Sequence, residues 1–102
     1  MIFIEDQGFQ SRRKGLMDDE EVFRFLEWLA VHPDLGKVIP ASGGLRKIRW
    51  AAKEHGKRGG ARVIYFWWIN ADRILLLNIY AKNEQEDLTA AEIEKLKRKA
   101  VI

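Results

Sequence analysis

The fold is decided by one stretch, which reads Ala61-Arg62-Val63-Ile64-Tyr65-Phe66-Trp67-Trp68-Ile69, then Asn70-Ala71-Asp72, then Arg73 and Ile74-Leu75-Leu76-Leu77-Asn78-Ile79-Tyr80-Ala81. β-Branched and aromatic residues fill both long runs, and the polar residues between them are typical of a tight turn. We therefore expect two antiparallel strands, at residues 61–69 and 74–81. Because the first run is apolar on both faces, it should lie in the centre of a sheet.

Outward from this hairpin, residues 45–51 alternate with period two and predict a further strand, and residues 2–4 predict a short first strand. Residues 52–60 form a loop rich in lysine and glycine. We expect a single α+β domain over residues 1–102, with a mainly antiparallel four-stranded sheet, two N-terminal helical segments and a C-terminal helix.

The helices are predicted from their caps. A short segment at residues 10–15 precedes a longer helix, which begins at the N-cap Asp18, has Glu21 in a capping-box position and ends before Pro33. The last helix begins at Thr89, with Glu92 completing a capping box. The predicted inner faces are Val22, Leu26 and Leu29, widened by Phe23, Phe25 and Ala30, and later Ile93, Leu96, Ala100 and Val101. Trp28 lies away from that apolar face and either packs on the sheet or stays exposed.

Composition narrows the class of protein. With 102 residues, 47% hydrophobic and 32% charged, the chain is typical of one globular domain. It has no cysteine, which excludes disulfides and thiolate metal sites. The N-terminal residues 1–6 lack the pattern of a signal peptide, and the longest apolar run, residues 63–69, is far too short to span a bilayer. We expect a cytoplasmic protein without a membrane partner.

Charge is distributed unevenly along the chain. Residues 1–36 hold four Lys or Arg against eight Asp or Glu, whereas residues 37–62 hold eight Lys or Arg against Glu54 alone. A basic block of this density indicates a polyanion as partner, although many charged clusters are simply solvated.

The basic block carries the candidate site. Alternation places Lys47 and Arg49 on one face of their strand, Arg62 begins the next strand, and Tyr80 lies near the end of the third. In an antiparallel sheet these ends meet at one edge, which predicts a cationic surface with an aromatic side chain for base stacking or proton exchange. Further RNA contacts are expected from Arg46, Lys53, Lys57, Arg58 and Lys82. Only two histidines are present, so no metal site is expected.

Strict alternation assigns Tyr80 to the face shared with Leu76 and Asn78, opposite a buried set of Leu75, Leu77 and Ile79. Cations near a tyrosine stabilise its phenolate, so we expect the pKa of Tyr80 to be lowered.

Three strings of this chain resemble the RelE/HigB-type toxins of bacterial toxin–antitoxin systems, most closely the HigB-like branch. They are residues 44–49 (Gly-Leu-Arg-Lys-Ile-Arg), residues 56–65 (Gly-Lys-Arg-Gly-Gly-Ala-Arg-Val-Ile-Tyr) and residues 80–89 (Tyr-Ala-Lys-Asn-Glu-Gln-Glu-Asp-Leu-Thr). The order of the predicted elements agrees over nearly the whole chain.

The resemblance implies a ribosome-dependent endoribonuclease that cuts mRNA by attack of a ribose 2′-hydroxyl, with no metal or other cofactor. Arg62 matches the arginine that stabilises the transition-state phosphate, and Lys47 and Arg49 match a basic pair on the preceding strand. Lys47, crowded by cations, is a candidate general base. The implied partners are the ribosome, mRNA and a cognate antitoxin. The antitoxin is expected to be a helix-turn-helix protein, and the toxin is expected to bind operator DNA only through it.

The chain departs from the family in its C-terminal segment, where Asn83 and Thr89 stand in place of an arginine and a tyrosine. Tyr80 is the nearest tyrosine that can substitute. This departure supports a second hypothesis, a catalytically silent module that binds RNA or the ribosome. A third hypothesis, a protein-interaction module, is supported by Trp28 and the acidic first long helix.

Overall fold

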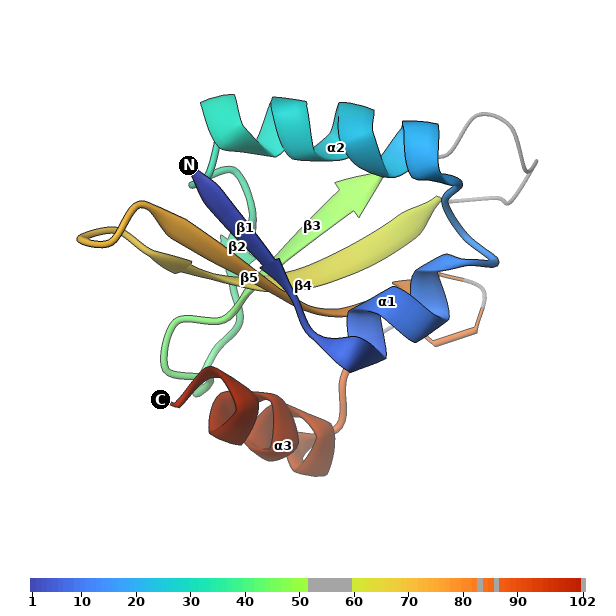
Figure 1. The fold of residues 1–102 in the computed structure, drawn as a ribbon. Coiled ribbons are helices and arrows are strands. Elements are labelled where there is room, and N and C mark those ends of the chain that lie inside the picture. Colours follow the sequence, from blue (N-terminus) through green and yellow to red (C-terminus); the bar gives the residue numbers. More distant parts are fainter. Residues whose placement is uncertain (52–59, 83, 86, 102) are drawn as a thin grey trace.

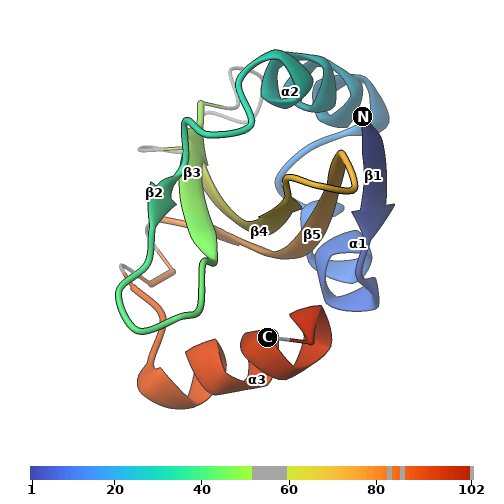
Figure 2. The same ribbon diagram turned by 90° about the vertical axis from the view of Figure 1, so that its left-hand side faces the viewer.

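A five-stranded sheet forms the centre of the molecule, with helices on both of its faces (Figures 1 and 2). The computed structural model describes residues 1–51, 60–82, 84–85 and 87–101. Along the chain its elements are β1 (Ile2–Glu5), α1 (Gln7–Arg13), α2 (Asp19–Val31), β2 (Lys37–Val38), β3 (Arg46–Trp50), β4 (Ala61–Trp68), β5 (Arg73–Ala81) and α3 (Ala90–Ala100). The predicted α+β class is confirmed.

The strands lie in the order β1-β5-β4-β3-β2. As predicted, β4 is central and pairs antiparallel with both β3 and β5, while β1 adds to β5 in parallel. The predicted number of strands was wrong by one, because Lys37 and Val38 pair with Lys47 and Arg46 as a two-residue edge strand. This strand is too short to leave a periodic signal, and a side chain helps to hold it, since Arg46 Nη1 donates to the Gly36 carbonyl at 2.8 Å.

One side of α2 is fixed to β3 by a buried carboxylate. Asp18 caps the helix as predicted, accepting from the Glu21 backbone N–H at 2.7 Å. The Glu21 side chain turns inward, where Oε2 accepts from Trp50 Nε1 at 2.8 Å and Oε1 from Arg24 Nη2 at 2.9 Å. These hydrogen bonds, that from Trp50 foremost, hold the pKa of Glu21 below its usual value.

Trp28 packs on the sheet, which decides between its two predicted positions. Its ring centroid lies 5.3 Å from that of Trp50 and 6.3 Å from that of Phe25. Phe23, in contrast, is 64% exposed, so its predicted place on the inner face was wrong. The core on this face of the sheet, which we call the α2-side core, is formed by Phe9, Leu16, Met17, Val22, Phe25, Leu29, Ile48, Ala61, Val63, Tyr65, Ile74, Leu76, Ile79 and Ala81.

The opposite face is covered in part by α3 (Figure 1). Its predicted capping box is present, with Thr89 and Glu92 exchanging hydrogen bonds. Val101 adopts a left-handed conformation beyond the helix and is 86% exposed, so its predicted burial was wrong. The core on this side, the α3-side core, is formed by Leu45, Ile64, Leu75, Leu77, Tyr80, Leu96 and Ala100.

A β-bulge in the central hairpin changes which side chains share a face. Ile64 pairs with Asn78 but Tyr65 pairs with Leu76, so Leu77 has no partner in the register. The extra residue inverts the alternation beyond it, which moves Ile79 to the α2-side core and Tyr80 to the α3-side core. Strict alternation was therefore wrong in placing Leu76 on the face of Tyr80, and in placing Ile79 on the face of Leu75 and Leu77. Tyr80 does share a face with Asn78, as predicted.

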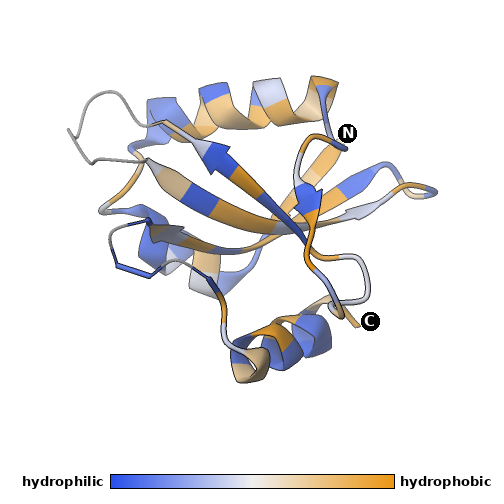
Figure 3. Ribbon diagram, turned by 180° about the vertical axis from the view of Figure 1, so that it is seen from behind, coloured by the Kyte–Doolittle hydropathy of each residue, from blue (hydrophilic) through white to orange (hydrophobic). Residues whose placement is uncertain are grey.

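Hydrophobic colouring gathers along β4 and β5, while β3 and each helix carry both hydrophilic and hydrophobic residues (Figure 3). Within the described part of the chain, no helix combines the length and the apolar character needed to cross a membrane.

Candidate functional site

Four cations project from neighbouring strands on the α3 side of the sheet. Arg49 of β3 is paired in register with Arg62 of β4, which is also paired with Tyr80 of β5. Two residues further from this end, Lys47 of β3 is paired with Lys37 of β2. Because paired residues on antiparallel strands project to the same face, these side chains form one cluster, which we call the cationic cluster.

The cationic cluster opens onto a pocket of about 300 Å³. The pocket is lined by Leu35, Lys37, Lys47, Ile48, Arg49 and Arg62. These lining side chains are all cationic or apolar, so the pocket offers donors and positive charge to a ligand. Such a site suits a phosphate oxyanion, for which arginine is a geometrically matched donor.

The loop before β2 is fixed by a buried tyrosine, and this positions Lys37. The Tyr65 hydroxyl donates to the Pro33 carbonyl at 2.7 Å and accepts from the Gly36 N–H at 3.0 Å. A Cβ atom at Gly36 would lie 2.6 Å from this hydroxyl, so the close approach requires glycine. Burial raises the pKa of Tyr65, which keeps its phenol neutral. Lys37 follows directly and is held beside Lys47.

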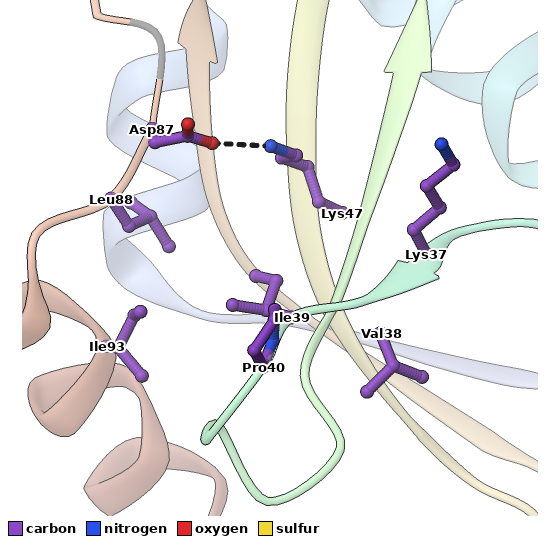
Figure 4. A pocket seen from close by; sticks show the side chains of 8 residues that line it. All are labelled: Lys37, Val38, Ile39, Pro40, Lys47, Asp87, Leu88 and Ile93. Atoms are coloured by element: carbon purple, nitrogen blue, oxygen red, sulfur yellow. Dashed lines mark hydrogen bonds and ion pairs between the residues drawn. The ribbon is translucent and has the colours of Figure 1, made fainter.

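Lys47 forms an ion pair that bears on its predicted role. Its Nζ lies 2.7 Å from Asp87 Oδ1 (Figure 4). The hydrogen bond and the charge of Lys47 lower the pKa of Asp87. The ion pair fixes the position of Lys47 Nζ. The role of Lys47 as general base stays a prediction.

Tyr80 is part of the α3-side core. It is 0% exposed, so the prediction that it is a surface aromatic for base stacking was wrong. Burial is the largest influence on its hydroxyl and raises its pKa, although Lys47 and Arg62 act in the opposite direction. The predicted lowering was therefore wrong as well, because desolvation outweighs the nearby cations. The predicted role of the hydroxyl as proton donor is not tested by the structure, but its burial argues against it.

The remaining predicted residues are distributed differently. Arg46 lies on the α2 side, where Nη1 donates to the Asp34 and Gly36 carbonyls and the guanidinium lies 5.9 Å from the Trp67 ring centroid. It is therefore a structural residue that the cationic cluster does not include. Lys82 is exposed and follows β5 at the end where Arg62 lies, with its backbone N–H 3.3 Å from the Gly60 carbonyl oxygen. Lys53, Lys57 and Arg58 lie outside the described residues.

Sequence reasoning missed Lys37 because it predicted no strand between Pro33 and residue 45. The available signal was weak: a lysine next to Val38 and Ile39, before a proline, at the start of the basic block. For metal ions, no group of three or more His, Asp or Glu residues comes together within the described ranges.

Comparison with known proteins shows which family this chain belongs to. A family model described as the RelE toxin of the RelE / RelB toxin-antitoxin system matches residues 30–102, which is well over half of the chain. The chain belongs to the RelE toxin family. Its fold is also that of the E. coli toxin RelE, solved as a double mutant in the free state, with a TM-score of 0.64 at 12% identity over 99% of this chain and 97% of that one.

As a member of the RelE family, this chain is the toxin of a toxin–antitoxin system. Its partner is an antitoxin, and its activity is that of a nuclease. The matched segment contains β2 to β5 and α3, so it includes the whole cationic cluster. It omits β1, α1 and most of α2. The elements that build the candidate site are therefore the ones that carry the family likeness.

Proposed function

We propose that this toxin is a ribosome-dependent endoribonuclease that cuts mRNA without a metal ion. The observation that carries the proposal is the cationic cluster, in which Lys37, Lys47, Arg49 and Arg62 line one pocket on an open part of the sheet. Arg49 and Arg62 are paired in register and line this pocket, so both guanidinium groups can donate to one anion. A phosphodiester is that anion.

The chemistry follows from the donor set. The ribose 2′-oxygen attacks the adjacent phosphorus, the bond from phosphorus to the 5′-oxygen breaks, and the products are a 2′,3′-cyclic phosphate and a 5′-hydroxyl. One proton leaves the 2′-oxygen and one is delivered to the departing 5′-oxygen. The phosphorane between these states carries extra negative charge, which preorganised arginine donors stabilise. We assign this stabilisation to Arg62 and Arg49.

The lysines bind the RNA around the reacting phosphate. Lys47, held by Asp87, contributes positive charge to the phosphate oxygens. Lys37 extends the same charge toward β2, and Lys82, with Lys53, Lys57 and Arg58 of the basic loop, is proposed to contact RNA beyond the cluster. Phosphate contacts of this kind position an RNA but do not specify its sequence.

The proposed setting is the bacterial cytoplasm, where the toxin acts on mRNA at the ribosome. Its antitoxin is proposed to be a helix-turn-helix protein that alone contacts operator DNA, as in the HigB-like branch that the sequence resembles. The three strings at residues 44–49, 56–65 and 80–89 support that branch.

The deciding experiment is primer extension on mRNA carried by translating ribosomes, with and without the purified toxin. Cuts that require the ribosome and leave a 2′,3′-cyclic phosphate support the proposal. Cleavage should continue when EDTA is added, and a known metal-free nuclease in a parallel reaction shows whether the ribosomes remain intact. Restoration of lost activity by one particular divalent ion would contradict the metal-free mechanism.

A catalytically silent RNA- or ribosome-binding module is the second candidate. Thr89 stands where the resemblance implies a tyrosine, and its hydroxyl serves as the N-cap of α3. Tyr80, the nearest tyrosine, is buried, so neither position presents an accessible tyrosine. In this case the same reactions would give ribosome binding that weakens steeply with salt, but no new mRNA ends.

A further inference from the structure

A second pocket adjoins the cationic cluster (Figure 4). It has a volume of about 360 Å³, and its apolar wall is formed by Val38, Ile39, Pro40, Leu88 and Ile93. Lys37 and Lys47 line this pocket as well as the first one, so the two pockets share a rim. An apolar pocket of this size with a few polar groups at its mouth has the character of a small-molecule site.

Asp87 gives the second pocket a property that the first one lacks. Among the described side chains that line the two pockets, it is the single anion, and the other charged ones are all donors. Its side chain is 76% exposed, and Lys47 engages one carboxylate oxygen. A carboxylate has about four acceptor sites, so it retains the capacity to accept from a ligand.

We propose that this second pocket holds the base of a nucleotide next to the scissile phosphate, and that Asp87 favours bases with an exocyclic amino group over uracil. The assignment rests on the proposed function, because the RNA phosphate at the shared rim brings the base to the pocket. Single-stranded RNA is read with its bases splayed out, by contacts to their faces and hydrogen bonds to their edges.

Each part of a nucleotide has a matching group in the pocket or at its rim. The apolar wall contacts the base, and Lys37 and Lys47 hold the attached phosphate. The carboxylate accepts from the amino group of cytosine, adenine or guanine, as aspartate does in other nucleic-acid interfaces. Uracil presents a carbonyl oxygen where cytosine has its amino group, and this oxygen repels a carboxylate.

The first test is an NMR titration of the intact toxin with the four nucleoside 3′-monophosphates and with inorganic phosphate. We expect cytidine, adenosine and guanosine monophosphates to shift the signals of Leu88 and Ile93 at lower concentrations than uridine monophosphate. Inorganic phosphate should shift signals of the cationic cluster and leave those of Leu88 and Ile93 unchanged. Equal responses to all four nucleotides, or an equal response to phosphate alone, would overturn the assignment.

The second test maps cleavage sites on ribosome-bound mRNA for variants of the pocket. Asp87→Asn should lower discrimination against uracil by about fivefold or more, whereas Glu94→Gln, which removes the same charge from α3, should leave it unchanged. Ile93→Trp fills the pocket and should broaden the preference. Ile69→Trp, at the exposed turn between β4 and β5, is its matched control.

The outcomes separate this inference from the proposed function. If the wild-type toxin cuts no mRNA, the proposed function fails, while the titration still decides whether a base binds. If the wild type cuts and Ile93→Trp keeps the wild-type preference, no base occupies the pocket, and a peptide of the antitoxin is the remaining occupant. A uniform loss of rate at every site in Asp87→Asn would assign Asp87 to positioning Lys47 and overturn base selection.

Discussion

The two faces of the sheet are built from the same alternating strands but are covered to different extents. On one face, α2 lies along the strands, and Trp28, Trp50 and Phe25 close the space between them. On the other face, α3 packs over Leu75 and Leu77, and the ends of β3 and β4 remain open with cations on them. The comparison shows how a small domain of this kind separates stability from function.

The polar groups of the two faces are used differently. Glu21 is buried on the α2 side and its charge is met by Trp50 and Arg24. On the α3 side, Arg49 and Arg62 stand side by side and line an open pocket. Buried polar groups that are satisfied within the protein contribute to its structure, whereas charges gathered in an open pocket can stabilise a ligand.

The largest expected effect is on activity and comes from the α3 side. Arg62→Ala should lower the rate of mRNA cleavage by ~10²–10³, because a preorganised donor to the transition state is lost. Circular dichroism and urea unfolding should show an intact fold. Arg73→Ala removes the same charge from the opposite end of the sheet and should cleave normally. If Arg62→Ala cleaves at the wild-type single-turnover rate, Arg62 does not stabilise the transition state.

On the α2 side, Glu21→Gln should lower the free energy of unfolding by about 2 kcal/mol at neutral pH, since hydrogen bonds to a charged group are lost. Cleavage per folded molecule should not change. The wild-type advantage should depend on pH. The pKa of Glu21 is lowered in the folded state, so its contribution is present above its usual value of 4.5 and is lost as pH falls through the lower folded value.

Urea unfolding of both proteins across this pH range tests the Glu21 prediction. The two curves should converge below pH 4.5. A difference that persists in acid would show that the loss comes from packing alone. A fall in cleavage rate at full folding would instead link the α2 side to the site.

A smaller effect is expected from Lys37, which lies at the edge of the cationic cluster. Lys37→Ala should weaken ribosome binding and reduce the slope of log affinity against log salt by about 0.7, the value for one phosphate contact on single-stranded RNA. Lys14→Ala, an exposed lysine just after α1, should leave the slope unchanged. An unchanged slope in Lys37→Ala would remove Lys37 from the RNA-binding surface.

Much of this fold was predictable because its signals are local. Apolar runs with turn residues between them predicted β4 and β5, and the caps Asp18 and Thr89 predicted where two helices begin. The cluster of Lys47, Arg49 and Arg62 followed from alternation, which needs only neighbouring residues. The same rule also indicates that Arg46 lies on the opposite face from Lys47, so a contact of Arg46 with RNA would fall outside the cationic cluster.

The features that were missed depend on pairing between distant segments. The two-residue strand β2 exists because Arg46 and Tyr65 hold the chain before it, and neither contact leaves a pattern in residues 37–38. The bulge in β5 is set by its pairing with β4, and it moves Tyr80 to the face of the cations while burying its ring. Tyr80 therefore lies on the same face as the cationic cluster, but its ring is not accessible to solvent.

The smallest expected effect concerns two buried tyrosines, one for each face. Tyr80→Phe should change the cleavage rate by no more than about threefold, because a buried hydroxyl cannot reach the RNA; a true proton donor would cost ~10²–10⁴. Its pKa is raised above the usual value of 10.0, so the pH–rate profile should also keep its shape at lower pH. Tyr65→Phe makes the same change on the α2 side and loses the bonds to Pro33 and Gly36, which should lower the free energy of unfolding by about 1–2 kcal/mol. A large loss of rate in Tyr80→Phe, with its stability unchanged, would show that this hydroxyl reaches the substrate on the ribosome, and the α3 side would then contribute its core as well as its cations to the reaction.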